Sequence, residues 1–65
     1  MIGKIKMYNN KKGYGFIHTD DDNDIFFHFS SILNEDFAEL SPGQKVEFEL
    51  EESSRGFRAR NIRLI

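Results

Sequence analysis

Two aromatic segments hold the side chains whose chemistry is most informative in this sequence. Residues 14–18 read Tyr-Gly-Phe-Ile-His, residues 24–28 read Asp-Ile-Phe-Phe-His, and an acidic turn separates them. Because side chains alternate between the faces of a strand, Tyr14, Phe16 and His18 share one face, and so do Phe26 and His28. Exposed rings offer flat π surfaces for stacking. An ordinary half-buried hairpin carries polar residues there, so this surplus of rings predicts a functional surface.

The opposite face of the same predicted hairpin is aliphatic and suits a core. It holds Ile17 on the first strand, and Ile25 and Phe27 on the second. An alternative interpretation inverts the two faces and makes the ring-rich face the core. Phe29 has the parity of Ile25 but stands at the end of its strand, so it can face either way. Phe37, in a polar loop, is either a cover on the core or part of the ring surface.

Length and composition limit the chain to one small domain, residues 1–65. A domain of this size buries only about 60% of its unfolded surface. It has no cysteine, and therefore no disulfide or zinc–thiolate site to stabilise it. Rings left exposed by so small a core indicate a function. The first residues resemble neither a signal peptide nor a membrane span, so we expect a cytoplasmic protein.

The net charge is −2, but basic and acidic residues are segregated along the chain. Acids fill the middle, and basic residues concentrate near the two ends, at Lys4, Lys6, Lys11, Lys12, Arg55, Arg58, Arg60 and Arg63. If the two ends form neighbouring strands, one side of the fold is basic. For Lys4, Lys6 and Arg58 the alternative is an ordinary solvated charge.

The other segments predict further strands joined by short connections. Residues 2–9 alternate with Ile5 inward and Lys4 and Lys6 outward, and residues 9–13 form a turn. A short helical turn at residues 30–33 is followed by a loop. Pro42 and Gly43 occupy the second and third positions of a predicted type II turn.

Two C-terminal strands complete the predicted fold. Residues 45–51 alternate, with Val46, Phe48 and Leu50 inward and glutamates outward, and residues 52–56 form a loop. In the last strand, residues 57–65, Ala59 and Ile62 can both face inward only if the strand contains a bulge. We therefore expect an all-β fold in which five short strands close into a small barrel.

Residues suited to catalysis or metal binding are few. His18, His28 and the neighbouring aspartates are the only candidates for acid–base chemistry, and no pair among them has a supporting spacing. The alternating aspartates of residues 20–24 imitate the start of a calcium loop, but the glycine and the final glutamate of that loop are missing. We expect no enzymatic activity, no metal and no cofactor.

The segments 12–17 and 24–30 resemble the first and second ribonucleoprotein motifs of the bacterial cold-shock proteins. The similarity extends to the opening Gly-Lys-Ile-Lys, the loop Phe37, the Pro-Gly-Gln turn and the closing Arg-Gly-Phe-Arg-Ala-Arg-Asn-Ile. The resemblance implies a five-stranded antiparallel OB-fold barrel. It further implies a monomeric RNA chaperone that binds single-stranded RNA and DNA, with low sequence specificity, a pyrimidine preference and a role in transcription regulation.

The resemblance also implies a nucleic-acid-binding site made of rings and charged residues. Its members are Lys6, Met7, Tyr8, Lys12, Tyr14, Phe16, Asp24, Phe26, His28, Phe29, Phe37, Arg55 and Phe57. The rings would stack bases, at about 1–3 kcal/mol for each base. Lys6, Lys12 and Arg55 would contact phosphates or base edges.

Met7 departs from the family pattern, which usually has tryptophan at this position. A thioether side chain can lie against a base, but it lacks a stacking plane, so we expect some loss of affinity. Strict alternation from Ile5 also turns Met7 inward, whereas the family's residue faces the ligand. A bend or bulge near Tyr8 would reconcile the two.

Two other function classes compete with single-strand binding. The first is an OB-fold protein-interaction module that uses the ring face as its interface. Such an interface does not need lysines between the rings, and its binding would not depend strongly on salt. The second is an enzyme such as a nuclease, for which only the unsupported histidine and aspartate residues are available.

Overall fold

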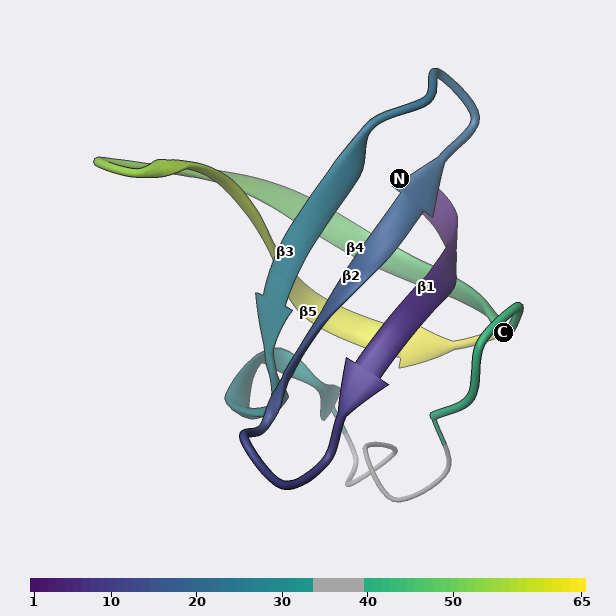
Figure 1. Ribbon diagram of the computed structural model, residues 1–65. Coiled ribbons are helices and arrows are strands. Elements are labelled where there is room, and N and C mark those ends of the chain that lie inside the picture. Colours follow the sequence, from purple (N-terminus) through teal and green to yellow (C-terminus); the bar gives the residue numbers. More distant parts are fainter. Residues whose placement is uncertain (34–39) are drawn as a thin grey trace.

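The chain forms a small closed barrel of strands (Figure 1). The computed structural model describes residues 1–33 and 40–65, so the predicted loop residue Phe37 lies outside the described residues. The elements are β1 (Ile2–Asn9), β2 (Tyr14–Thr19), β3 (Asp24–His28), the 3₁₀ turn η1 (Phe29–Ser31), β4 (Lys45–Ser53) and β5 (Gly56–Leu64). The helical turn therefore begins one residue earlier than expected.

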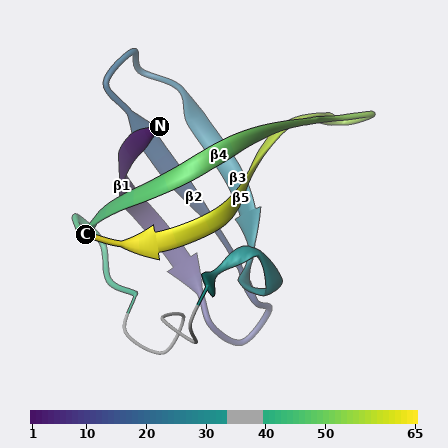
Figure 2. The same ribbon diagram turned by 180° about the vertical axis from the view of Figure 1, so that it is seen from behind.

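The strand order β1-β2-β3-β5-β4, with β1 also paired to β4, closes the barrel. The predicted all-β, five-stranded OB-fold barrel is confirmed. One detail is corrected: β3 and β5 run parallel, while the other pairs are antiparallel. The view from behind shows β4 and β5 crossing over the β1–β2–β3 layer (Figure 2).

The core confirms the predicted faces of the hairpin. Ile17 and Phe27 are fully buried, and Ile25 is nearly so. They pack with the inward residues of the other strands, which include Ile5, Val46, Phe48, Ala59 and Ile62. The alternative in which the ring-rich face forms the core is therefore wrong.

A bulge in β1 changes which side chains face the core. Ile5 pairs with Ile17, but Met7 pairs with Phe16, so β1 contains one residue more than β2 at this point. Met7 consequently shares the outer face with Phe16. Tyr8 turns inward and stacks on Phe27, with ring centroids 5.9 Å apart. A bulge of the kind that would reconcile strict alternation with the resemblance is therefore present, between Ile5 and Met7.

A second bulge lies in β5 and confirms the prediction made from Ala59 and Ile62. Glu47 pairs with Arg63 and Glu49 with Arg60, so three steps on β5 match two on β4. Asn61, within the extra step, has a positive φ of 50°. Both Ala59 and Ile62 are fully buried as a result.

The β4–β5 hairpin differs from the predicted boundaries. β4 continues to Ser53 and β5 begins at Gly56, so the expected loop at 52–56 is a two-residue turn. The hairpin projects beyond the barrel (Figure 1). Leu50 pairs with the inward Ala59, yet it is 38% exposed, because few residues cover the strand where it leaves the barrel. Leu50 therefore lies on the predicted face of β4, but it is not buried in the core.

Candidate nucleic-acid interface

Three rings on β2 and β3 form a continuous outward-facing surface, which we call the ring platform: Tyr14, Phe16 and Phe26. Phe16 pairs directly with Phe26 across the two strands. Ring centroids lie 5.9 Å apart for Phe16 and Phe26, 6.0 Å for Tyr14 and Phe26, and 6.3 Å for Tyr14 and Phe16. The rings support one another edge to face or stacked, while Phe26 remains 38% exposed.

The platform continues at the end of β3 through His28 and Phe29. His28 pairs with Tyr14, and its ring centroid lies 4.6 Å from that of Phe29. Nδ1 of His28 accepts a hydrogen bond from the Ser30 amide at 3.2 Å and lies 2.8 Å from the Ser30 hydroxyl, and these contacts fix the orientation of the ring. Phe29 is 41% exposed, so the alternative in which it faces the core is wrong.

Gly13 packs directly against the ring of Phe29. Its φ is +75°, which favours glycine, and a methyl group there would lie 2.7 Å from Cδ1 of Phe29. The backbone of Phe29 also donates to the Gly13 carbonyl at 2.8 Å. The turn between β1 and β2 and the aromatic end of β3 are therefore packed as one unit.

Lys12 lies on that turn and lines a hollow of about 210 Å³ together with Tyr8, Gly13 and Phe29. Tyr8 thus contributes one wall of this hollow while its ring packs on Phe27. The structure does not bring Tyr8 onto the ring platform. A cation beside exposed rings is the combination that suits an anionic ligand with flat groups.

A charged network borders the other end of the platform. Nζ of Lys6 lies 2.6 Å from one carboxylate oxygen of Asp24, and Nδ1 of His18 lies 2.7 Å from the other. The Lys6 hydrogen bond, followed by that of His18, holds the pKa of Asp24 below its usual value. Asp24 in turn raises the pKa of His18, with a smaller contribution from Asp22 at 3.4 Å. Asp24 therefore orients the Lys6 ammonium and the His18 ring at the platform edge.

Comparison with known proteins agrees with this geometry. The family model described as "'Cold-shock' DNA-binding domain" matches residues 1–65. The chain belongs to the cold-shock domain family. It is 50% identical to the major cold shock protein CspA of Bacillus cereus over 62 residues, 95% of this chain and 92% of that protein. It is 47% identical to cold shock protein CspB of Geobacillus stearothermophilus, over 92% of this chain and 91% of that protein.

A third relative spans the whole chain. The cold shock-like protein of Thermotoga maritima is 45% identical over 65 residues, which are 100% of this chain and 98% of that protein. Each of these relatives is matched over nearly its full length. The resemblance inferred from the two motifs is therefore confirmed over residues 1–65.

Two site residues predicted for this cold-shock domain lie away from the ring platform. Arg55 is in the turn at the tip of the projecting β4–β5 hairpin. Phe57 is 56% exposed and lines a different hollow, with Ile25 and Leu50. The physical reason is the length of β4 and β5, which carries their connecting turn beyond the barrel (Figure 1).

Two side chains near the platform were not among the predicted site residues. His18 belongs to the network of Asp24, and its place on the ring-rich face was the signal that could have included it. Arg58 pairs with Phe26 across β3 and β5. No local pattern indicates that neighbour, because the two strands are distant in sequence.

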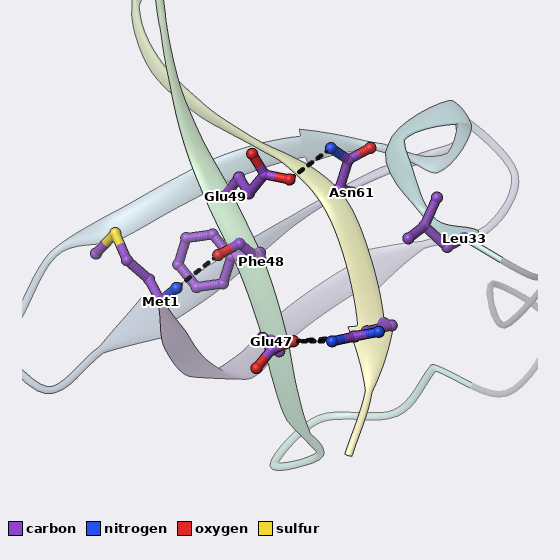
Figure 3. A pocket seen from close by; sticks show the side chains of 7 residues that line it. Met1, Leu33, Glu47, Phe48, Glu49 and Asn61 are labelled. Carbon is purple, nitrogen blue, oxygen red and sulfur yellow. Dashed lines mark hydrogen bonds and ion pairs between the residues drawn. The ribbon is translucent and has the colours of Figure 1, made fainter.

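The structure offers little else that suggests chemistry. Among residues 1–33 and 40–65, no group of three or more histidine, aspartate or glutamate residues is placed to hold a metal ion. No helix in the same residues is long and apolar enough to cross a membrane. A pocket between β4 and β5 has Phe48 at its floor, and its polar residues Glu47, Glu49 and Asn61 are already hydrogen-bonded (Figure 3).

Proposed function

We propose that this cold-shock domain binds single-stranded RNA and DNA, without catalysis, by stacking successive bases on the ring platform. The observation that carries the proposal is the contrast between neighbouring residues of β3: Phe27 is fully buried, while Phe26 lies exposed beside Tyr14 and Phe16. Every base has a π face, so such a surface accepts many sequences, with about 1–3 kcal/mol for each stacked base. Preference for pyrimidines is part of the proposal.

Charged residues beside the rings support a nucleic-acid ligand over a peptide. Lys12 flanks Phe29, and Lys6 lies at the other end of the platform. With about three phosphate contacts, the logarithm of the binding constant falls with the logarithm of salt concentration at a slope near −2. An OB-fold interface for a protein partner would lack this steep dependence.

A protein that holds bases by their faces also keeps RNA unpaired. Paired bases hide their faces in the stack, so binding favours the open strand by mass action. RNA chaperone activity follows from this preference. We propose that one monomer acts on each short segment of strand in the cytoplasm.

The test measures anisotropy of a labelled pyrimidine strand of about 6–7 bases, a length within the OB-fold range. The matched variants are Phe26→Ala and Phe27→Ala, adjacent residues on opposite faces. Phe26→Ala should weaken binding by roughly 5- to 100-fold, the loss of one stack. Phe27→Ala should instead destabilise the fold, by about 3–5 kcal/mol in urea denaturation.

Duplex of equal length serves as competitor and should displace the strand poorly. Equal affinity for duplex and single strand would show that bases are not stacked on the platform. An intact labelled RNA after long incubation is expected for a protein without nuclease activity. A complex of one protein per strand, measured by light scattering, is expected for a monomer.

A further inference from the structure

Arg58 lies at the edge of the ring platform on the strand next to Phe26. The two residues form the direct pair between β3 and β5. Residues paired in this way project to the same face of a sheet, and neighbouring strands lie about 4.8 Å apart. The next residue, Ala59, is fully buried, so Arg58 points outward, as Phe26 does. The ring surface therefore continues onto β5 as a cation.

Glu51 holds the guanidinium of Arg58. Nε of Arg58 donates to Oε1 of Glu51 at 2.5 Å, and Nη1 of Arg60 donates to Oε2 at 3.3 Å. The Arg58 hydrogen bond keeps the pKa of Glu51 below its ordinary value, so the carboxylate is ionised at neutral pH. The protein thus supplies its own anionic partner for the guanidinium that borders the platform.

This ion pair is exposed enough for a ligand to displace it. The side chain of Arg58 is 54% exposed, and that of Glu51 is 29% exposed. Exposed ion pairs contribute little to stability, because water and salt screen them. A guanidinium can donate two parallel hydrogen bonds to one anion. The oxygens of a phosphate accept them as well as those of a carboxylate do.

We propose that Arg58 binds the backbone phosphate of the nucleotide stacked on Phe26, and that Glu51 competes with that phosphate for the guanidinium. The inference rests on the proposed function, since it requires a base on the ring platform. It assigns a role to a residue that is otherwise an ordinary surface charge. It also assigns Glu51 the role of a built-in competitor that weakens binding.

Arg63 provides a matched control from the same pair of strands. It is paired with Glu47 on β4, with Nε at 2.9 Å and Nη2 at 2.5 Å from Oε1, and its side chain is 57% exposed. Arg63 lies on the other side of the β5 bulge and lines the pocket with Met1, Leu33 and Phe48 (Figure 3). The two arginines share their type of ion pair and differ in their neighbours.

The experiment measures affinity for a labelled thymine strand of about seven bases over a range of salt concentrations. Arg58→Gln should weaken binding by roughly 3- to 10-fold, and the salt slope should become less negative by about 0.7, the loss of one phosphate contact. Arg63→Gln should change affinity less than twofold. Arg58→Lys keeps the positive charge but cannot donate two parallel hydrogen bonds. The salt slope of this variant should match that of the unmodified protein.

Glu51→Gln tests the competition. It should tighten binding by roughly threefold, whereas Glu47→Gln, which removes the same charge beside Arg63, should tighten it less. In the double variant Glu51→Gln with Arg58→Gln, the gain should disappear. The arginine side chains are exposed and the two glutamate side chains are partly exposed, so none of the substitutions changes the core. Thermal denaturation verifies that each variant is folded.

Equal losses for Arg58→Gln and Arg63→Gln would overturn the inference, because net charge alone would then explain both. An unchanged affinity of Arg58→Gln, together with a large loss in Phe26→Ala, would also overturn it while leaving the proposed function intact. If the unmodified protein does not bind the strand at all, the proposed function and the inference both fail.

Discussion

Met7 occupies the position at which the resemblance to the cold-shock proteins predicts a tryptophan. The β1 bulge places it opposite Phe16 on the outer face, where it is half-buried. Its thioether can touch a base but provides no plane for stacking. We predict that Met7→Trp tightens binding of a pyrimidine strand by about 1 kcal/mol, roughly fivefold, at the low end for one stack.

The same substitution supplies its own probe, because the chain has no tryptophan. A new indole on the ligand face should lose fluorescence when bases stack on it, with a midpoint that agrees with anisotropy. Met7→Leu is the matched control and should leave affinity nearly unchanged. An indole whose emission is insensitive to the oligonucleotide would place residue 7 away from the ligand.

His18 is the residue through which we expect the stability of the domain to depend on pH. Its pKa is raised chiefly by the hydrogen bond to Asp24, with Lys4, Lys6 and Asp22 as the other charged neighbours. A raised pKa in the fold means that stabilisation is complete below the unfolded value of about 6.5 and is lost as pH rises through the folded value. We predict that melting temperature declines across this window by a small amount, since the pair is exposed.

His18→Gln should flatten this decline. The measurement is the difference in melting temperature between the two proteins, followed from pH 5.5 to about 8.5; His28 is present in both and cancels. The difference should favour the unmodified protein at low pH and shrink as pH rises. A difference that stays constant with pH would mean that the contact of His18 with Asp24 has no effect on stability.

At the scale of elements, two bulges determine which side chains reach the core and which reach the ligand. The bulge in β5 depends on Asn61, whose φ is +50°. Asparagine tolerates this conformation better than most residues, and its amide also donates to Glu49 at 2.7 Å. We predict that Asn61→Ala lowers the free energy of unfolding by about 1 kcal/mol, because alanine disfavours left-handed backbone.

Asn61→Gly is the matched control, because it loses the same amide but adopts positive φ without a clash. Urea denaturation should therefore find the glycine variant closer to the unmodified protein than the alanine variant. Equal destabilisation by both would assign the effect to the hydrogen bond instead of the backbone.

The bulges also show how far the sequence could predict this fold. Alternation predicted the faces of β2 and β3 correctly, because each strand is regular along its own length. It required a bulge between Ala59 and Ile62, which is present. Near Tyr8, a bend or bulge was only one way to reconcile alternation with the resemblance, and the structure contains that bulge. Alternation did not reveal that the β1 bulge sends Tyr8 to Phe27, because register depends on pairing with another strand.

At the scale of the whole molecule, barrel closure creates neighbours that no local pattern contains. The parallel pairing of β3 with β5 places Arg58 beside Phe26, although 31 positions separate them in sequence. Arg55 lies away from the rings because β4 and β5 are long, and their connecting turn is beyond the barrel. Resemblance supplied the members of the site, whereas only the closed barrel shows which of them lie together.

The barrel as a whole should gain stability from its ligand. A ligand that binds only the folded state at 100 times its dissociation constant adds about 2.7 kcal/mol. For a domain of 60–100 residues, each kcal/mol corresponds to about 4–8 °C, so the melting temperature should rise by roughly 10–20 °C. A pyrimidine single strand should produce this shift, and the equivalent duplex should not, because its base faces are covered.

The double variant Phe16→Ala with Phe26→Ala separates binding from folding in the same measurement. Its rings lie outside the core formed by Ile17 and Phe27, so its melting temperature without ligand should remain within several degrees of the original. The shift on adding the single strand should be almost lost. A variant that unfolds without ligand would make the rings part of the core, and one that keeps the full shift would move the binding surface elsewhere on the barrel.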